Sequence, residues 1–407
     1  MKLLHIALRN IFRNRRRSVL NLIALTTGFV VLLLGLGWVQ GYHSYVYGSM
    51  IDLETGHAHY LAKGYLEEQR RLPVDIGISN YAELRRLLLE HPSVEAAGGR
   101  IDFAVKVAAA GQALWLIGRA VEPAEEKLVS TIDDFVVEGS FFDSGRGLLV
   151  GRPVAEALGI TAGSTVFLTA RDKNGVENFI DIKVAGIFDF GYPLMDKSMV
   201  FIDMESAVRL LDTVDMVNRL VARLKPGISP ERFLADAPQL PGNGEWHSWR
   251  RFADAAVKAV EADSGGFYGL IVIIYILISL GVLNSLSMTV HERSREIGTL
   301  KALGWRPARI RWLFLLEALS LASIASLAGL LVSLPLIAWL QGQGVDLTGA
   351  MPADMPVPFG ERFRADFLPW HFMFSFGLSF LTALLGAWLP AGRGARLPIA
   401  LALRGKH

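Results

Sequence analysis

The sequence predicts an α-helical polytopic membrane protein with four transmembrane helices and a large mixed α/β extracytoplasmic domain between helices 1 and 2. Three observations predict this fold class. The chain of 407 residues contains four apolar runs, a polar segment of 226 residues separates the first run from the second, and basic residues cluster beside some ends of the runs but not others. Because a helix needs roughly 20 apolar residues to cross the bilayer core, each run is long enough to span it.

The four apolar runs are almost free of charge, and their acidic or basic residues are His43, Glu317 and His371. The first run is too long for a signal peptide, and no small-residue cleavage site follows it. We therefore predict four transmembrane helices, at residues 18–40, 267–290, 312–340 and 367–390.

The basic residues predict the orientation of the chain, since Lys and Arg are retained on the cytoplasmic side. Six basic residues and no acid lie in residues 1–17, which we expect to form a cytoplasmic amphipathic helix, and six more lie in residues 291–311. The loop 341–366 holds two basic residues against four acids. We therefore expect the N-terminus, the 291–311 segment and the 391–407 tail to be cytoplasmic. Residues 41–266 and 341–366 are expected outside.

The composition of the large segment excludes several function classes. Residues 41–266 hold 23 basic and 32 acidic residues, whereas a nucleic-acid binder carries a basic patch on its folded domain. We expect no nucleic-acid partner. The chain has no cysteine, which removes disulfide frameworks, Cys-ligated zinc and iron–sulfur clusters.

The pattern of residues 41–266 predicts a mixture of helices and strands. A helix is expected between Ser79 or Asn80 and Pro92, and strands are expected at 103–110 and 113–121. Pro153 begins a helix after a strand. Residues 164–190 predict a hairpin with Asn174 and Gly175 at its turn.

No catalytic signature stands out in the sequence. It contains neither the G-x-x-x-x-G-K-[ST] loop that cradles ATP phosphates nor a G-x-S-x-G nucleophile elbow. His57 and His59 would face the same way on a strand and could hold a metal, but with no third ligand nearby we favour a surface histidine pair. We expect no catalytic residue and no metal site, and interpret the outside domain as a binding or transmitting module.

The segment that follows the second apolar run predicts a short amphipathic cytoplasmic helix. Ile297, Leu300 and Leu303 would form one face, with charged residues on the others, and Gly304 would end the helix before Pro307 begins the next. We interpret it as a helix presented to a cytoplasmic partner. The alternative is a basic loop that only anchors topology.

The string ERSREIGTLKALGWRPARI, residues 292–310, resembles the coupling segment of the FtsX/MacB/LolC–LolE family of ABC transporter permeases. Both ends of the chain resemble that family's terminal signatures. The strings are ALRNIFRNRRRS near the N-terminus and LPAGRGARLPIALALR near the C-terminus. The layout of one span, a large outside domain and three further spans is similar too. Two strings within residues 147–211 look most like the lipoprotein-releasing (LolC/LolE) branch of this family. They are LLVGRPVAEALGITAGSTVFL and VAGIFDFGYPLMDKSMVFIDMESAVRLL.

The resemblance implies a non-catalytic permease subunit of the bacterial inner membrane that binds no cofactor itself. ATP and Mg would be bound by two copies of a separate ABC ATPase subunit, and a second permease would complete a homo- or heterodimer. The substrate would be a lipoprotein or another lipid-anchored molecule, extracted by movement of the outside domain. Two alternatives are MacB-like efflux through an adaptor and outer-membrane channel, and FtsX-like signalling to a cell-wall hydrolase. A periplasmic chaperone or an adaptor would be a further partner.

Three groups of candidate site residues follow from this resemblance and from the sequence. Glu317, inside the third run, is an intramembrane acid, which either marks a functional site or pairs with a basic residue of the N-terminal helix, such as Arg13 or Arg16. The residues expected to couple to the ATPase are Glu292, Arg293, Arg295, Glu296, Ile297, Gly298, Leu300, Lys301, Leu303 and Gly304. The residues expected to line a substrate cavity, or else an ordinary interfacial aromatic belt, are Gly37, Trp38, Tyr42, Phe267, Tyr268 and Gly269.

Overall fold

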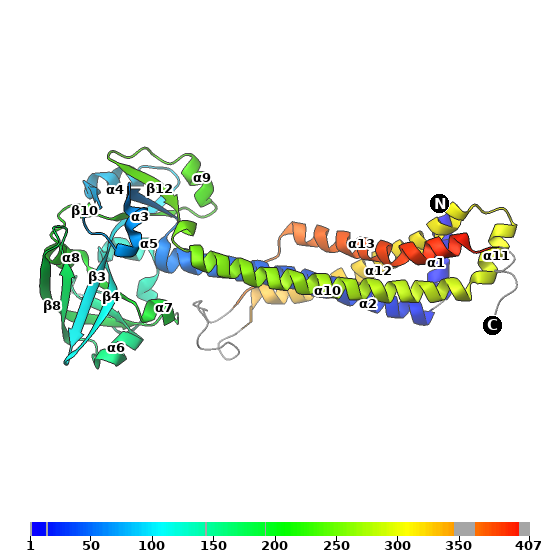
Figure 1. Ribbon diagram of the computed structural model, residues 1–407, viewed down its shortest axis with the longest axis horizontal. Helices are drawn as coiled ribbons and strands as arrows, with labels where there is room; N and C mark the ends of the chain where they lie inside the picture. The colour runs from blue at the N-terminus through cyan, green and yellow to red at the C-terminus, as the bar shows by residue number, and fades with distance from the viewer. Residues whose placement is uncertain (1, 14, 143–144, 192, 346–362, 399–407) are drawn as a thin grey trace. The chain divides into compact units, whose positions relative to one another are not determined.

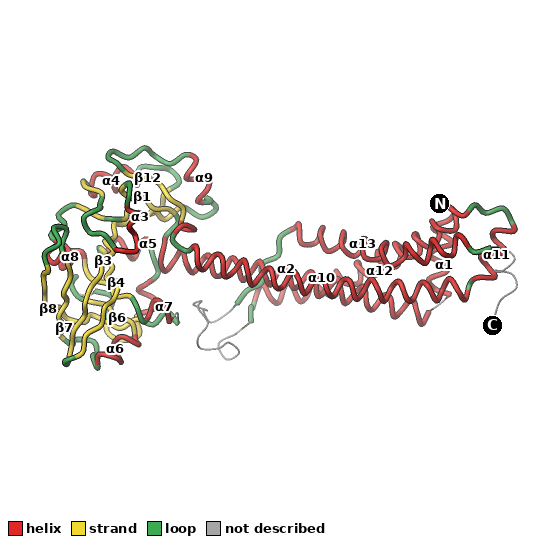
Figure 2. Tube along the Cα trace, in the orientation of Figure 1, coloured by secondary structure: helices red, strands yellow, loops and turns green. Residues whose placement is uncertain are grey.

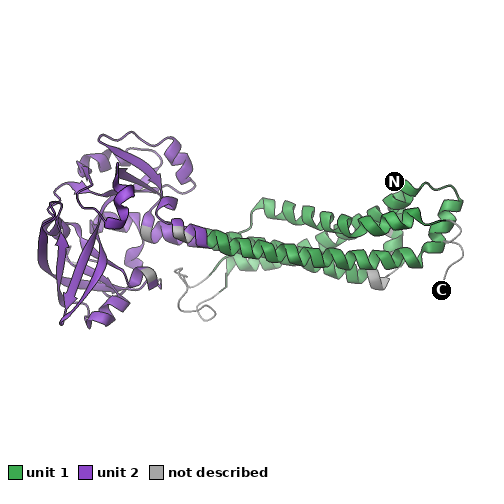
Figure 3. Cartoon of the chain, in the orientation of Figure 1, with its two compact units in different colours: residues 1–44, 260–346, 362–407 green, residues 45–259, 347–361 purple. Residues whose placement is uncertain are grey.

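The computed structural model describes the chain except for residues 1, 14, 143–144, 192, 346–362 and 399–407. It divides into two compact units, which are described separately (Figure 3). Unit 1 comprises residues 1–44, 260–346 and 362–407, and unit 2 comprises residues 45–259 and 347–361. Most of the predicted 341–366 loop and the end of the 391–407 tail lie outside the described residues.

Unit 1 is built from helices (Figure 1). Its elements are α1 (Lys2–Arg13), α2 (Arg15–Met50), α10 (Asp254–Glu292), α11 (Ser294–Ala302), α12 (Pro307–Gly342) and α13 (Pro369–Arg396), of which α2 and α10 also contribute residues to unit 2. Four helices in the described part of the chain are long and apolar enough to cross a membrane: Ser18–Leu53, Val257–Glu292, Pro307–Gly342 and Pro369–Arg396. The predicted fold class of four membrane helices is therefore confirmed.

Small side chains let the membrane helices of unit 1 pack closely, because lipid tails offer no hydrophobic force that would drive apolar helices together. The core between α12 and α13 contains Ala318, Ala322, Ala383 and Ala387, all buried. Gly386 of α13 lies against α10, where an added Cβ would come within 2.9 Å of the Ser279 carbonyl oxygen. Bulkier residues at these positions would hold the helices apart.

Unit 2 is the mixed α/β domain between the first two membrane helices, and Figure 2 shows that the strands gather there. Its strands are β1 (Ala58–Ala62), β2 (Ile78–Ser79), β3 (Val94–Ala109), β4 (Gln112–Val121), β5 (Val136–Gly139), β6 (Leu148–Gly151), β7 (Thr165–Arg171), β8 (Glu177–Phe188), β9 (Met199–Asp203), β10 (Met216–Val217), β11 (Arg219–Leu224) and β12 (Gly244–Ser248). Its helices are α3 (Tyr65–Glu68), α4 (Tyr81–Leu89), α5 (Pro123–Val129), α6 (Arg152–Leu158), α7 (Pro193–Asp196), α8 (Met204–Leu211) and α9 (Pro230–Ala235). Short helical turns lie at η1 (Ile51–Thr55), η2 (Gln69–Arg71), η3 (Ile132–Phe135) and η4 (Trp249–Arg251).

The main sheet runs in the order β12-β1-β11-β3-β4-β9-β6-β8-β5, with β7 pairing β3 and β8, and the described strands β2 and β10 form a separate pair. Its pairs are antiparallel except β4–β9 and β6–β8. One buried cluster, which includes Phe103, Val150 and Ile202, covers a face of β3, β6 and β9 and packs against α6 and α8. Asp203 caps α8 by accepting a 2.8 Å hydrogen bond from the Ser206 backbone N–H.

Several predicted elements of unit 2 are confirmed. Helix α4 begins after Asn80 and ends before Pro92. The strand predicted at 113–121 falls within β4, and the one predicted at 103–110 corresponds to the second half of β3, which ends one residue earlier at Ala109. Strands β7 and β8 form the predicted hairpin. At its turn the Asp172 carboxylate accepts hydrogen bonds from the backbone N–H groups of Asn174 (2.8 Å) and Val176 (2.9 Å), a local side-chain bond that stabilises such turns.

The expectation that His57 and His59 form a surface pair is wrong, because His59 is fully buried on β1. Its ring packs against Phe252 with centroids 4.2 Å apart and the planes tilted by 45°. Neither ring nitrogen has a hydrogen-bond partner in the described part of the chain. Burial lowers the pKa of His59 well below the ordinary value of 6.5, and the charges of Arg219, Arg100 and Arg119 lower it further.

We expect the stability of the protein to fall as the pH drops below 6.5, partly because of His59. Below this pH the unfolded chain protonates His59 while the folded chain keeps it neutral. The contribution of neutral His59 to the free energy of unfolding is therefore complete above pH 6.5. Below pH 6.5 it is lost by up to about 1.4 kcal/mol for each pH unit. The His59→Leu protein should show a shallower loss of thermal stability between about pH 7 and pH 5 than the wild type. The control His5→Leu, at an exposed histidine of α1, should keep the wild-type slope. An unchanged slope for His59→Leu would contradict the assignment.

Candidate functional site

The candidate site is helix α11 with the ends of the helices around it. The helix ends at Ala302, with Leu303 as its C-cap. It stops there because Gly304 has a φ of 90°, a left-handed conformation that glycine adopts without strain. Trp305 then donates its N–H back to the Leu300 carbonyl at 3.0 Å, and Pro307 occupies the first turn of α12. The predicted stop and restart of the helix are thus confirmed.

The two faces of α11 have different environments. Ile297 is buried in a cluster of unit 1 that includes Ile310, Phe314 and Ala391, and Gly298 is also buried. The prediction that Ile297, Leu300 and Leu303 share one docking face is therefore wrong: Ile297 packs on the chain's own core, Leu300 is half-buried, and Leu303 is 74% exposed. Periodicity alone could not tell which partner covers each position.

The outward side of α11 carries Arg295 and Thr299, with Leu303 at its C-cap. Together with Glu292, the last residue of α10, we call these residues the exposed strip. Arg295, Thr299 and Leu303 are four residues apart, so they lie along one side of the helix. Lys301 lies apart from it and donates to the Leu397 carbonyl at 2.6 Å. The strip combines one apolar side chain with charged neighbours, an arrangement suited to a reversible interface.

Ion pairs connect α11 to two other helices of unit 1. The largely buried side chain of Arg293 lies between two carboxylates, with Nε 3.0 Å from Glu296 Oε2 and Nη1 3.2 Å from Glu317 Oε2. Glu296 also pairs with Arg13 of α1. We call Arg13, Glu296, Arg293 and Glu317 the four-residue network. Burial raises the pKa of Glu296, but hydrogen bonds from Arg13 and Arg293 outweigh it, so the pKa lies below its usual value.

The predicted partner of Glu317 needs correction. Arg13 lies in the network but pairs with Glu296, and the Glu317 carboxylate is bound by Arg293. The side chain of Arg16 lies outside the described residues. Arg293 is adjacent because α10 ends at Glu292 and α12 returns past it, so a residue 24 positions away meets Glu317. Arg293 is one of the predicted coupling residues, but no pattern in the sequence signals its pairing with Glu317.

The residues expected to line one cavity do not lie together. An added Cβ on Gly37 would collide with the Phe367 ring, and Trp38 packs on Phe363 with ring centroids 4.3 Å apart. Tyr268 is partly exposed, and Gly269 has nothing within 4 Å of its Cβ position. Gly37 and Trp38 therefore contact the segment before α13, whereas Tyr268 and Gly269 face outward.

Two further candidates have other neighbours. Phe267 lies against Gly35 of α2, where an added Cβ would collide with its ring. Tyr42 donates a long 3.5 Å hydrogen bond to Asp263. These contacts join α2 to α10.

An apolar groove of about 270 Å³ lies instead between α10 and α13. Sequence reasoning missed it, although Tyr275, Ser279 and Thr382 stand out as polar residues within apolar runs. The Tyr275 hydroxyl donates to the Gly28 carbonyl at 3.0 Å, and Thr382 donates to the Leu378 carbonyl at 2.8 Å. Because both hydroxyls bond backbone atoms, the groove presents mostly apolar surface.

Comparison with known families gives two matches. The family described as FtsX-like permease C-terminal matches residues 268–399, and the family described as MacB-like periplasmic core domain matches residues 18–240. The second match covers more than half of the chain and includes the strands of unit 2 up to β11. The first covers α11 and most of the membrane helices that follow unit 2.

Three characterised relatives are similar to the chain at low identity. The lipoprotein-releasing system transmembrane protein LolC of Neisseria meningitidis serogroup B is 23% identical over 95% of this chain and 94% of its own length. The lipoprotein-releasing system transmembrane protein LolE of Haemophilus influenzae is 21% identical over 94% of this chain and 92% of its own. The macrolide export ATP-binding/permease protein MacB of Wolinella succinogenes is 24% identical over 71% of this chain but only 41% of its own length.

Proposed function

Because the chain belongs to the family of FtsX-like permeases with a MacB-like periplasmic core domain, we propose that it is the permease subunit of an ABC transporter that extracts lipid-anchored substrates from the bacterial inner membrane. The observation that carries the proposal is the match to LolC and LolE along nearly the full length of both chains. The match to MacB spans less than half of that protein.

In this proposal the energy comes from two copies of a separate ATPase subunit, which bind ATP and Mg. The exposed strip of α11 docks on that subunit. Through the four-residue network, a movement of α11 is carried to α1 and α12. The basic residues of 1–17 and 291–311 favour a cytoplasmic position for α11 and both termini, where ATP is available.

A second permease, identical or related, packs on α10. Of the 18-residue apolar windows in the four membrane helices, the one in α10 is only 17% buried within the chain, against 33% to 39% in the other three. Its exposed side chains include Leu270, Ile273 and Leu277. This helix therefore has the largest surface left for a partner helix or for lipid.

The groove between α10 and α13 is the candidate site for an acyl chain of the substrate. Its apolar lining and its position within the membrane helices suit a hydrocarbon chain. Efflux of the MacB type is the second candidate function, supported by the match to that protein over 71% of this chain.

The function is tested by reconstituting the permease with its ATPase subunit in proteoliposomes that contain a fluorescent triacylated lipopeptide. The expected result is ATP-dependent release of the lipopeptide to a soluble acceptor, with no release of the same peptide lacking acyl chains. ATP-dependent transport of a soluble drug without lipopeptide release would favour efflux instead and overturn the proposal.

The groove is tested by a photo-crosslinking side chain at position 276, whose native isoleucine lines the groove. We expect an ATP-sensitive crosslink to the lipopeptide. The matched control is position 331, where a leucine on α12 is 70% exposed but away from the groove, and which should crosslink bulk lipid only. Equal labelling of the lipopeptide from both positions would remove the groove as a substrate site.

A further inference from the structure

A small hollow in unit 2 lies over the face of four adjacent strands. It has a volume of about 270 Å³, and its lining includes Asp102 of β3, Arg119 of β4, Met199 of β9 and Arg219 of β11. These strands are neighbours in the order β11-β3-β4-β9. Asp102 lies directly opposite Arg119 in the β3–β4 ladder, and Ile117 lies directly opposite Met199 in the β4–β9 ladder. The register therefore places charged and apolar side chains side by side.

The hollow has more positive than negative charge. Asp102 accepts a 2.8 Å bond from Arg119 Nε and lies 2.6 Å from Arg219 Nη2, so that one buried carboxylate serves two buried guanidinium groups. Arg70, an exposed residue, adds a third positive charge to the lining. Burial raises the pKa of Asp102, but the two guanidinium groups outweigh it and hold the pKa below its usual value.

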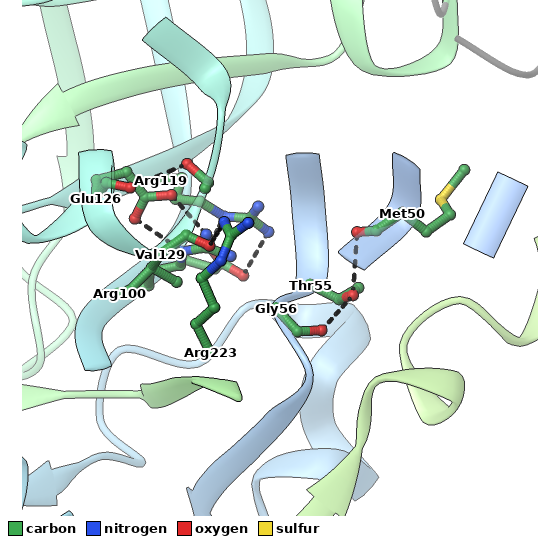
Figure 4. Close-up of polar contacts among 10 residues, drawn as sticks. Met50, Thr55, Gly56, Arg100, Arg119, Glu126, Val129 and Arg223 are labelled. Atoms are coloured by element: carbon green, nitrogen blue, oxygen red, sulfur yellow. Dashed lines mark hydrogen bonds and ion pairs between the residues drawn. The ribbon is translucent and has the colours of Figure 1, made fainter. Parts of the chain in front are cut away.

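The neighbouring acid does not neutralise this excess. Glu126 is buried and bound at both oxygens by Arg100, with Nη2 2.5 Å from Oε1 and Nε 3.1 Å from Oε2; Figure 4 shows this pair next to Arg119. The buried cluster therefore holds three arginines, 100, 119 and 219, against two carboxylates. His59 supplies no negative charge.

Arg219 also has an unused donor. Its side chain is 5% exposed, its guanidinium lies 4.7 Å above the Phe252 ring, and its Nε has no acceptor in the described part of the chain. The buried hydroxyl of Tyr65 lies beside this guanidinium. Buried donors are nearly always satisfied in proteins. Because Arg219 shares its one carboxylate with Arg119, an oxyanion in the hollow would supply the acceptors that these two guanidinium groups lack.

We propose that this hollow binds a small organic anion, with its carboxylate or phosphate oxygens on Arg219, Arg119 and Arg70 and its apolar part on Leu72, Ile117 and Met199. Guanidinium groups match the geometry of both oxyanions, and the volume admits a ligand of about ten non-hydrogen atoms. The site is independent of the proposed transport function, since it lies wholly within unit 2.

Binding is tested by calorimetry on the full chain in nanodiscs of zwitterionic lipid. The probes are hexanoate, hexyl phosphate, acetate, inorganic phosphate and the uncharged hexanol. We expect one or both six-carbon anions to bind at least about tenfold more tightly than acetate or inorganic phosphate, and hexanol not to bind. Preference for hexanoate or for hexyl phosphate would identify the oxyanion. Absence of binding by all five probes at about 10 mM would overturn the proposal.

Variants decide whether binding occurs in this hollow. Arg70→Glu, at an exposed residue, should lower the affinity at least about tenfold without affecting folding. The control is Arg86→Glu, which makes the same charge change at an exposed residue outside the hollow. Arg219→Lys keeps the charge but removes the guanidinium and should also weaken binding. Equal affinity in the Arg70→Glu and Arg86→Glu proteins would show that the anion binds elsewhere and would overturn the site.

Discussion

Replacing Leu303 with aspartate is expected to lower ATP-driven transport by at least about tenfold while leaving the chain folded and inserted in the membrane. Leu303 is the exposed apolar side chain of α11, and apolar anchors at the centre of an interface commonly contribute 2 kcal/mol or more to binding, about a thirtyfold change in affinity. A carboxylate there would have to be desolvated on docking. Because Leu303 does not pack within the chain, its loss should not affect folding.

Two measurements check this result: co-purification of the ATPase subunit with the permease, and ATP-dependent lipopeptide release. Both should fall by at least about tenfold. The matched control is Val214→Asp, which makes the same apolar-to-acid change at a residue of unit 2 that is 76% exposed, and should leave both unchanged. Full transport by the Leu303→Asp protein would show that α11 does not couple to the ATPase through this side chain.

The fold was largely predictable because its main signals are local. A run of 20 or more apolar residues has few alternatives to a membrane helix. Likewise, the Asn174–Gly175 turn needs only its flanking strands to define the hairpin of β7 and β8. The stop at Gly304 depends on a backbone conformation that one residue type adopts easily. Each of these features is determined within a few residues of the chain.

The environments of single side chains were less predictable, because they depend on residues distant in sequence. Helical periodicity grouped Ile297 with Leu303 but could not show that α12 and α13 cover only the first of them. Gly37 was predicted to line a cavity or an aromatic belt, but the Phe367 ring lies where a side chain at this position would be. His59 could have been exposed or buried until the β1 pairings with β11 and β12 were known.

The charged cluster at the hollow of unit 2 could not be predicted from the sequence for the same reason. Asp102, Arg119 and Arg219 belong to three strands, and only the β3–β4 and β3–β11 registers bring them to one hollow. A shift of one residue in either register would move a charged side chain to the opposite face of the sheet. No spacing along the chain signals this cluster, because 100 residues separate Arg119 from Arg219.

Replacing Arg293 with methionine is expected to destabilise the protein by about 3 kcal/mol or more, because it removes one partner of a buried ion pair and leaves the other. Glu317 is 5% exposed, and Arg293 is the basic residue that binds its carboxylate. Loss of Arg293 also removes one of the two guanidinium groups that bind Glu296. We therefore expect α11 to be held less firmly against α12, with a lower midpoint of thermal unfolding in detergent and weaker coupling to ATP hydrolysis.

A double-mutant cycle separates the ion pair from other effects of the substitution. Glu317→Gln alone should be destabilising, and the Arg293→Met/Glu317→Gln protein should be more stable than the two single changes predict, with a coupling energy of about 1–3 kcal/mol. The same cycle with Arg13→Met and Glu317→Gln should be close to additive, because Arg13 pairs with Glu296. The cycle with the larger coupling energy identifies the arginine that binds Glu317. A larger coupling energy in the Arg13 cycle than in the Arg293 cycle would show that α1, and not Arg293 beside α11, supplies the partner of Glu317.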